Sequence, residues 1–354
     1  MKPTARAGAV AVTAVACLLL PACSTSAGSA LSTSVPPSTT TIGLPSRVPM
    51  PAVQLGIDID FYATPGTNIS ASAQDDIAYV KHLDANAVSI SFPYYTNRAG
   101  TVVHALPKTP APSQLTTLIV AAERADLAVI LRPLLNEASL GTSRPGWEPT
   151  SLANWFTAYR QFLLPYARLA QADDVTMFVI GAEFSRFNQA PQWAALAAAV
   201  SQVYHGTVGY SNNWDTARNR APDVEQLLDA YQPIQLPTTA SLPALEDAWS
   251  AWTRRLPTGL VLSEVGVDPQ PGAFTRPWRR GQPGQPIIPD IQVKWFTAAC
   301  HSVAVEHLGG VYFWPLYFGQ SLTTPLGTKD PTAFAGTAGA TAIAQCFTTL
   351  QDLK

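Results

Sequence analysis

The sequence predicts an α/β fold, a closed (β/α)₈ barrel, and three observations lead to that prediction. Short apolar runs alternate with longer helical patterns from Leu55 onward. The runs are rich in β-branched residues and have little polar interruption, as expected for strands buried on both faces of a parallel sheet. Roughly 300 residues remain from Pro51 to the end, and α/β barrels typically use about 250 as one unit.

Eight segments have the pattern of strands, and the sixth is the weakest. They are Leu55–Phe61, Ala87–Phe92, Ala128–Pro133, Thr176–Ile180, Thr207–Tyr210, Gln232–Gln235, Gly259–Leu262 and Gly310–Phe313. Eight segments have helical spacing or helix-start signals. They are Ser72–Leu83, Pro112–Ala125, Ser151–Gln171, Pro191–Tyr204, Asp223–Ala230, Ser241–Arg255, Ile291–Val305 and Thr337–Leu350. One helix after each strand favours a closed barrel over an open doubly wound sheet, the main alternative.

The first 23 residues have the features of a secretory signal. Lys2 and Arg6 precede an apolar run over residues 7–20, which is too short to favour a membrane-spanning helix. The run ends in Leu-Pro-Ala-Cys at Cys23, and a cysteine in this place resembles the lipidated cysteine of bacterial lipoproteins. We therefore expect export and a lipid anchor on the outer face of the cell membrane. Cleavage without lipidation, giving a secreted protein, is the alternative, and Pro21 is unusual in such a motif.

Residues 24–50 are rich in Ser, Thr, Pro and Gly, so we expect a flexible linker before a barrel domain at 51–354. With Cys17 in the signal and Cys23 the lipidation candidate, two cysteines remain, Cys300 and Cys346. In an exported protein they could pair, or they could be two buried thiols. The formal net charge of −2 and the lack of a basic run argue against a nucleic-acid partner.

Two glutamates follow apolar runs at points where a barrel places its active site. Glu183 comes directly after the fourth strand and Glu264 after the seventh. The C-terminal ends of barrel strands share one mouth, so we expect both carboxyls to face it. Glycoside hydrolysis requires two carboxyl groups, one to donate a proton and one to attack or stabilise the anomeric carbon. In the alternative interpretation, each glutamate only pairs with a nearby arginine.

Polar and aromatic residues at the other strand ends favour a sugar ligand. Aromatic faces stack on pyranose rings, while amides, arginines and carboxylates bind hydroxyl groups. The candidates for substrate binding are Asp60, Arg132, Tyr210, Asn213, Trp214, Asp215, Trp278 and Trp314. Trp278 belongs to a long, proline-rich loop over Val267–Asp290, which we expect to form a wall of the substrate groove. Its three arginines could favour an acidic or phosphorylated glycan; a stiff solvated loop without a ligand role is the alternative.

Other hydrolytic chemistries have little support. The five histidines include no His-x-His at the first strand end, so we expect no metal. A Gly-x-Ser-x-Gly elbow is absent from the sequence, and no Gly-rich phosphate loop follows the first strand. We expect no cofactor.

Four pieces of the chain resemble glycoside hydrolase family 113, a branch of the retaining (β/α)₈ glycosidases known mainly for β-mannanases. The pieces are Ile180–Phe184, Tyr210–Asp215, Glu264–Gly266 with the later Pro277-Trp278, and Gly310–Trp314. The resemblance implies Glu183 as acid/base and Glu264 as nucleophile in a double displacement, with the carboxyls about 5–5.5 Å apart. Much of that clan has Asn before the acid/base, where this chain has Ala182, and Asn213 could replace it.

The predicted function is therefore retaining hydrolysis of a β-linked oligo- or polysaccharide, for example a β-mannoside. The alternative is a lipid-anchored barrel that binds glycans without turnover. Such a protein would keep the aromatic residues and lose one carboxylate, whereas both glutamates are present here.

Overall fold

The structure is a computed structural model, and it describes residues 47–218 and 224–352. The expected signal segment, Cys23 and the expected linker up to residue 46 lie outside the described residues. Within the described ranges, no helix is both long and apolar enough to cross a membrane.

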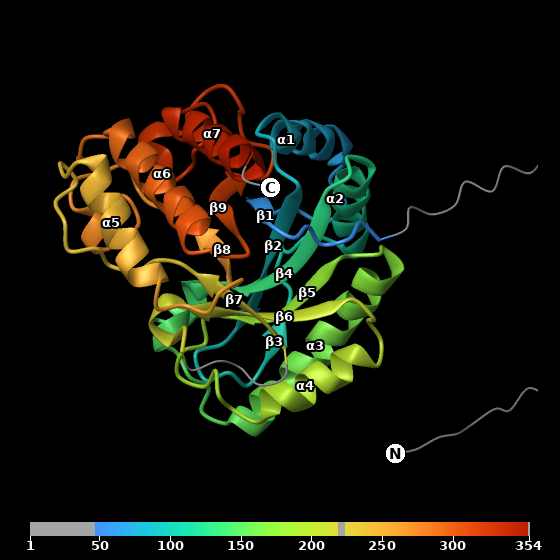
Figure 1. Cartoon of the computed structure of the whole chain (residues 1–354). Coiled ribbons are helices and arrows are strands. Elements are labelled where there is room, and N and C mark those ends of the chain that lie inside the picture. Colours follow the sequence, from blue (N-terminus) through green and yellow to red (C-terminus); the bar gives the residue numbers. More distant parts are fainter. Residues whose placement is uncertain (1–46, 219–223, 353–354) are drawn as a thin grey trace, which may run out of the picture. The chain divides into compact units, whose positions relative to one another are not determined.

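Eight parallel strands form a closed barrel, which confirms the predicted (β/α)₈ fold (Figure 1). In chain order they are β1 (Gln54–Asp60), β2 (Ala87–Thr96), β4 (Ala128–Leu135), β5 (Met177–Ala182), β6 (Thr207–Asn213), β7 (Glu225–Asp229), β8 (Val261–Val265) and β9 (Gly310–Tyr317). The barrel closes because β1 pairs in parallel with both β2 and β9. A two-residue strand, β3 (Val103–His104), pairs antiparallel with the end of β2.

Helices surround the barrel (Figure 1). They are α1 (Ser70–His82), α2 (Pro112–Arg124), α3 (Leu152–Ala172), α4 (Gln192–Ser201), α5 (Leu242–Thr253), α6 (Pro289–Val305) and α7 (Ala338–Asp352). Ser151 and Ser241 cap α3 and α5, each side chain accepting a hydrogen bond from a backbone N–H in the first turn. Short 3₁₀ turns lie in the loops: η1 (Glu137–Ser139), η2 (Arg144–Gly146), η3 (Trp214–Thr216), η4 (Ala273–Thr275) and η5 (Gly327–Lys329).

The sixth barrel strand is not where the sequence pattern placed it. The expected helix Asp223–Ala230 is wrong, because this segment contains β7, and the expected strand Gln232–Gln235 lies in the loop that follows. Leu227 points into the barrel and Leu228 into the helical layer. Val224, Leu227 and Leu228 also have the spacing of a helical stripe, so periodicity cannot distinguish a helix from a doubly buried strand here.

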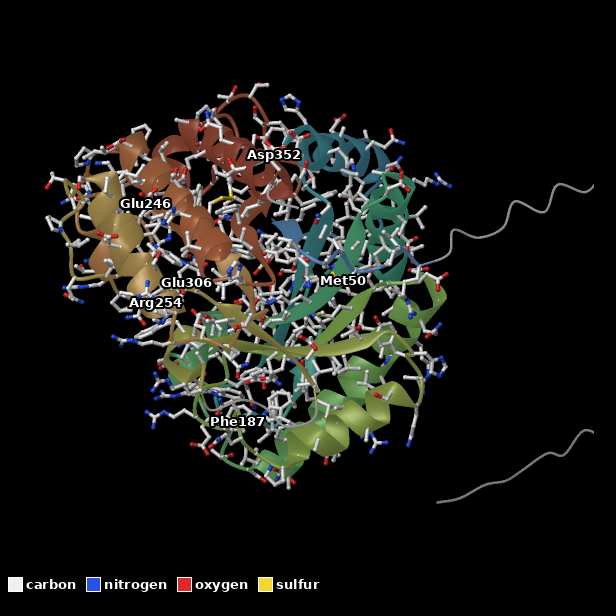
Figure 2. The ribbon with its side chains drawn as sticks, in the orientation of Figure 1. Met50, Phe187, Glu246, Arg254, Glu306 and Asp352 are labelled. Atoms are coloured by element: carbon white, nitrogen blue, oxygen red, sulfur yellow. A yellow bond between two sulfur atoms is a disulfide. The ribbon has the colours of Figure 1, made fainter. Side chains whose placement is uncertain are left out.

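Two apolar cores support the barrel and leave its upper interior polar. A large core fills the space between the strands and the helices. A smaller one fills the lower barrel, where Ile130, Val179 and Tyr312 pack together. Val48 and Met50, from the segment before β1, pack against this lower core (Met50 is labelled in Figure 2). The inward-pointing side chains nearer the C-terminal strand ends are not needed to fill this core. They are therefore available to form a functional site.

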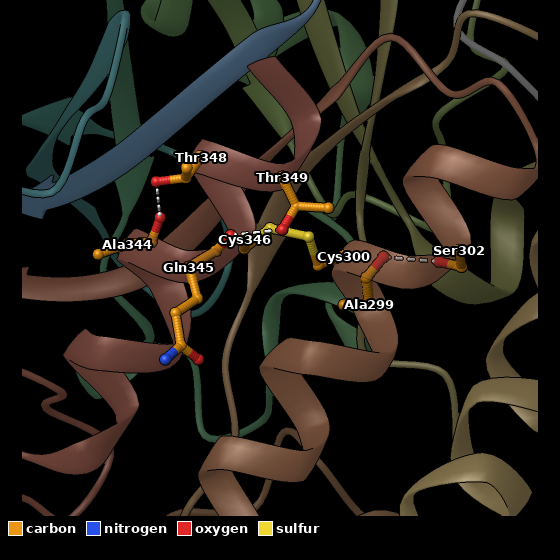
Figure 3. The surroundings of a disulfide bond; sticks show 8 residues. All are labelled: Ala299, Cys300, Ser302, Ala344, Gln345, Cys346, Thr348 and Thr349. Carbon is orange, nitrogen blue, oxygen red and sulfur yellow. Dashed lines mark hydrogen bonds between the residues drawn. A yellow bond between two sulfur atoms is a disulfide. The ribbon is translucent and has the colours of Figure 1, made fainter. Parts of the chain in front are cut away.

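A disulfide joins the last two helices. Cys300 of α6 and Cys346 of α7 are bonded, with a sequence separation of 46 residues, as Figure 3 shows. Both half-cystines are buried between the helices. On the chain-entropy account, closing a loop of this length stabilises the fold by about 4 kcal/mol.

Candidate active site

The two glutamates expected at the barrel mouth are brought together there. Glu183 follows β5, the fourth barrel strand, and Glu264 lies in β8, the seventh. Both are nearly buried, at 7 % and 4 % exposure. They are close enough that the charge of Glu264 helps to raise the pKa of Glu183, after the larger effect of burial.

A β-bulge turns Glu264 into the barrel. Alternation along β8 would place Ser263 inside and Glu264 outside, because Val261 belongs to the inner core and Leu262 to the outer one. The pairing of β8 with β9 shifts between Leu262 and Val265, which leaves one extra residue on β8. Ser263 and Glu264 consequently both point inward. Bulges often redirect a side chain in this way next to active sites.

The end of β5 is also irregular. The register with β6 shifts between Val179 and Ala182. At Gly181 a Cβ would lie 2.7 Å from both the Trp193 and Tyr210 rings, so the backbone packs directly against these aromatic rings and only glycine fits. Glu183 then has a φ of 59°, in the left-handed region that non-glycine residues rarely adopt. Such backbone conformations concentrate at functional sites.

A single buried arginine holds three carboxyls below the mouth. Arg132 of β4 donates from Nη1 to Asp58 at 3.0 Å and to Glu264 at 2.7 Å, and from Nη2 to Asp229. One cation cannot neutralise three buried carboxylates. Burial, opposed by Arg132, accordingly raises the pKa of Asp58 to about 7 and raises that of Asp229.

We expect Arg132→Met to be strongly destabilising, because it leaves buried carboxylates without their cation. The free energy of unfolding at pH 7 should fall by about 3–5 kcal/mol. The deficit should shrink as the pH falls to 5, because protonation neutralises the carboxyls. Urea denaturation at both pH values measures the effect, and Arg168→Met, on the exposed face of α3, is the matched control. A loss at pH 7 no larger than that of the control would contradict this account.

Both oxygens of Glu264 are fixed by hydrogen bonds. Arg132 donates to Oε2, and the hydroxyl of Tyr231, two residues after β7, donates to Oε1. Two donors, one of them a cation, stabilise the ionised carboxylate and fix its orientation. This carboxyl is therefore oriented for attack on a substrate in the barrel mouth.

Glu183 has a different environment. Arg144, in the turn η2 after β4, donates from Nε at 3.0 Å and from Nη2 at 2.6 Å, both to Oε2. In the part of the chain that the structure describes, no hydrogen bond to Oε1 of Glu183 is formed. Burial raises the pKa of Glu183, and Arg144 opposes that rise. A carboxyl with a raised pKa beside one that accepts hydrogen bonds on both oxygens is an arrangement that suits acid/base and nucleophile roles.

Replacing Arg144 should move the pH dependence of activity. Arg144→Gln removes a positive charge that lowers the pKa of Glu183, so that pKa should rise further. The alkaline limb of kcat/KM, which reports the acid of the free enzyme, should move up by about one pH unit. The pH profiles of the variant and of Arg168→Gln, a remote control, should be measured together. An alkaline limb that stays in place or moves down would show that Arg144 does not set this pKa.

Several of the other expected substrate-binding residues lie around the mouth. Trp214 and Trp278, which come from different loops, are stacked with ring centroids 5.7 Å apart and an angle of 13°. Asn213 donates to Asp215, which also accepts a hydrogen bond from Ser185.

Asp60 and Trp314 lie on the β1 and β9 side. Burial raises the pKa of Asp60, and the charges of Asp58 and Glu264 add to the rise, so Asp60 lies near both carboxyls. A Cβ at Gly266 would lie 3.2 Å from the Tyr231 hydroxyl oxygen and 3.3 Å from Cδ1 of Trp314. Trp314 is thus a neighbour of the residue that fixes Glu264.

Two expected substrate contacts are corrected by the structure. Tyr210 is fully buried and packs edge-on against Trp193 of α4, because its position on β6 points into the helical layer. Arg132 is 1 % exposed and its guanidinium bonds three carboxyls, so it holds Glu264 instead of binding sugar directly. The alternative interpretation, in which each glutamate pairs with an arginine, is also observed: Glu264 pairs with Arg132 and Glu183 with Arg144. Both pairs nevertheless lie at one shared mouth.

Three residues of the site were missed from the sequence. Asp229 and Tyr231 were missed because β7 was expected to be a helix. If this segment is interpreted as a strand, Asp229 lies at its C-terminal end, where a barrel places its active site. Arg144 lies in a loop, where no periodic pattern signals a contact. In the described residues, no cluster of three or more His, Cys, Asp or Glu side chains is arranged to hold a metal ion.

The closed barrel and the paired carboxyls at its mouth define the class: the chain is a glycoside hydrolase. A model of glycoside hydrolase family 113 matches residues 58–319. The chain therefore belongs to family 113, and this match includes both glutamates.

Solved structures with the same fold are distant in sequence. A family 113 β-mannanase from Alicyclobacillus acidocaldarius is 20 % identical with a TM-score of 0.70, over 84 % of this chain and 98 % of that chain. A family 113 β-1,4-mannanase is 18 % identical with a TM-score of 0.70, over 84 % and 99 %. A GH5_18 protein from Streptomyces cattleya is 12 % identical with a TM-score of 0.54, over 86 % and 81 %. No curated protein matches the chain.

Proposed function

We propose that the enzyme hydrolyses β-mannosidic bonds with retention, with Glu264 as nucleophile and Glu183 as acid/base. The observation that carries this proposal is the contrast between the two carboxyls. The two oxygens of Glu264 accept hydrogen bonds from Arg132 and Tyr231, whereas burial raises the pKa of Glu183. The substrate class rests on family 113 membership and on the β-mannanases among the similar structures.

The reaction proceeds by two displacements. In the first, an oxygen of Glu264 attacks the anomeric carbon while Glu183 donates its proton to the departing glycosidic oxygen, which leaves a glycosyl ester on Glu264. In the second, Glu183 removes a proton from water as the water oxygen attacks the anomeric carbon and releases Glu264. Tyr231 and Arg132 accommodate the changing charge of Glu264 without moving, since both already bond it.

The rim supplies the sugar contacts in this proposal. Trp278 stacks on Trp214 and is 51 % exposed, so part of its ring is free to stack on a sugar. Asn213 is fixed by Asp215 and takes the contact with the sugar 2-hydroxyl that Ala182 cannot make. Asp60 and Trp314 complete the surface on the β1 and β9 side.

Substrate preference is tested with purified full-length protein. Hydrolysis of aryl β-mannosides, aryl β-glucosides and mannooligosaccharides should show the highest kcat/KM on a mannose-configured substrate. A higher kcat/KM on β-glucosides would contradict the substrate class and leave the chemistry intact. No hydrolysis of any β-glycoside would contradict the proposed function.

We also propose that the chain is exported and anchored through a lipid on Cys23. The disulfide between Cys300 and Cys346 supports export, because disulfides persist in oxidising compartments. In a bacterial host, metabolic labelling with an alkyne fatty acid should mark the wild type and not Cys23→Ala. Equal labelling of both proteins, or of neither, would contradict the anchor.

A further inference from the structure

The loop between β8 and α6 contains a pocket that the proposed chemistry does not use. Its volume is about 440 Å³, and Arg276, Arg279 and Arg280 line it together with Asp268. The three guanidinium groups come from a stretch of five residues. Among the residues that the structure describes, none of these three side chains forms an ion pair or a hydrogen bond.

The walls of this pocket are ordered by hydrogen bonds. Gln270 is buried, donates to the carbonyls of Gln282 and Gln285, and accepts from the backbone N–H of Gln282. The backbone N–H of Ile288 donates to the carbonyl of Pro269 at 2.7 Å and closes the base of the loop. A pocket that is organised before binding loses less conformational entropy when a ligand enters.

A buried carboxyl in the lining has an unused oxygen. Asp268 is 4 % exposed, and its Oδ1 accepts a hydrogen bond from Thr332. Its Oδ2 is buried and has no hydrogen-bond partner in the described residues. Burial raises the pKa of Asp268 to about 6; the hydrogen bond from Thr332 and the charge of Arg280 oppose that rise, and the charge of Asp330 adds to it. Below pH 6 the carboxyl is therefore mostly protonated, and Oδ2 can donate to a ligand. In that state the carboxyl of Asp268 does not repel an anion.

The loop that lines the pocket also contacts residues of the barrel mouth. Trp278 lies between the arginines in sequence and stacks on Trp214, which directly follows β6. On the other side, the charge of Arg280 opposes the burial-driven rise in the pKa of Tyr317, the last residue of β9. The same tyrosine is influenced by Asp60, a residue of the mouth. We infer that a glycan lying across the tryptophans extends from the glutamates toward the arginines.

We propose that this pocket binds a phosphate or carboxylate group carried by the glycan, which makes the enzyme selective for anionic β-mannosides. The three arginines are exposed and lie within five residues of one another, so their charges repel, and a bound anion relieves that repulsion. Guanidinium groups bind phosphate and carboxylate oxygens through paired hydrogen bonds, which gives both affinity and orientation. A neutral sugar would leave these donors unpaired. The proposal rests on the proposed function, because it places the anion on that enzyme's substrate.

The test compares binding and turnover of matched substrates. Mannotetraose is compared with a mannotetraose that carries one 6-phosphate, and with one that carries one C6 carboxylate. Dissociation constants are measured calorimetrically on Glu183→Gln, so that the ligand is not consumed, and kcat/KM is measured on the wild type. The pocket variant is Arg279→Gln/Arg280→Gln. The control is Arg160→Gln/Arg168→Gln on the exposed face of α3, which removes the same charge.

We expect at least one anionic ligand to bind about tenfold more tightly than the neutral one, and the pocket variant to lose that difference. The control should keep it, and 0.5 M NaCl should reduce it, because exposed charges are screened. The two anionic ligands distinguish phosphate from carboxylate. Equal binding of neutral and anionic ligands, or an equal loss of both in the pocket variant, would overturn the inference. Selective binding without hydrolysis of any ligand would instead overturn the proposed function alone.

Discussion

Glu264→Ala should abolish glycoside hydrolysis while leaving a folded barrel. Losing a catalytic nucleophile removes the route through the covalent intermediate, and we expect kcat to fall by about 10⁵-fold or more. The measurement is kcat on an aryl β-mannoside, with circular dichroism to verify folding. The matched control is Glu225→Ala, an exposed glutamate at the opposite end of β7, which should retain the wild-type kcat.

Added azide sharpens this result. In Glu264→Ala the small anion can occupy the space of the missing carboxylate and attack the anomeric carbon, with Glu183 protonating the leaving group. The product of that single displacement is an α-glycosyl azide, of inverted configuration. Hydrolysis that survives the substitution, or a β-azide product, would show that Glu264 is not the nucleophile.

Glu183→Ala should have the next largest effect, and that effect should depend on the leaving group. General acid catalysis contributes about 10²–10⁴-fold, so mannooligosaccharides, whose leaving alcohol needs a proton, should lose that much in kcat/KM. With a dinitrophenyl β-mannoside, the dinitrophenolate leaves without protonation. The loss in kcat/KM on this substrate should therefore be far smaller. The measurement is the ratio of the two losses, and an equal loss for both substrates would contradict the acid role.

Azide should also act differently on this variant. Removing Glu183 leaves the glycosyl ester on Glu264 without a base to activate water, and azide needs no base. It should therefore accelerate turnover of the aryl substrate and give a β-glycosyl azide, of retained configuration. Opposite azide products from the two variants separate the two roles on one active site.

The position of the two glutamates could be predicted from strand ends alone. Glu183 and Glu264 follow apolar runs, and parallel strands in a barrel bring such positions to one mouth. The orientation of Glu264 could not be predicted in this way. Strict alternation points it away from the barrel, and only the β-bulge, a feature of the three-dimensional pairing, turns it inward.

The charged layer beneath the mouth was less accessible to sequence reasoning. Arg132 was expected to bind sugar because it lies near a strand end, but its depth depends on which side chains fill the lower barrel. Asp229 and Tyr231 follow a segment whose spacing fits a helix as well as a strand. Arg144 reaches Glu183 from a loop across 39 residues of sequence, a contact that no local pattern encodes.

In the proposed mechanism, Glu264 forms the covalent bond to the sugar. Incubation with 2-deoxy-2-fluoro-β-mannosyl fluoride, which slows breakdown of the intermediate, should add one fluoromannosyl group to the protein. Digestion and peptide mass spectrometry locate that group. We expect the group on Glu264, and we expect no labelling of Glu264→Ala. A label on Glu183 or on any other residue would contradict the account, as would turnover of this reagent without a trapped intermediate and with release of the inverted sugar.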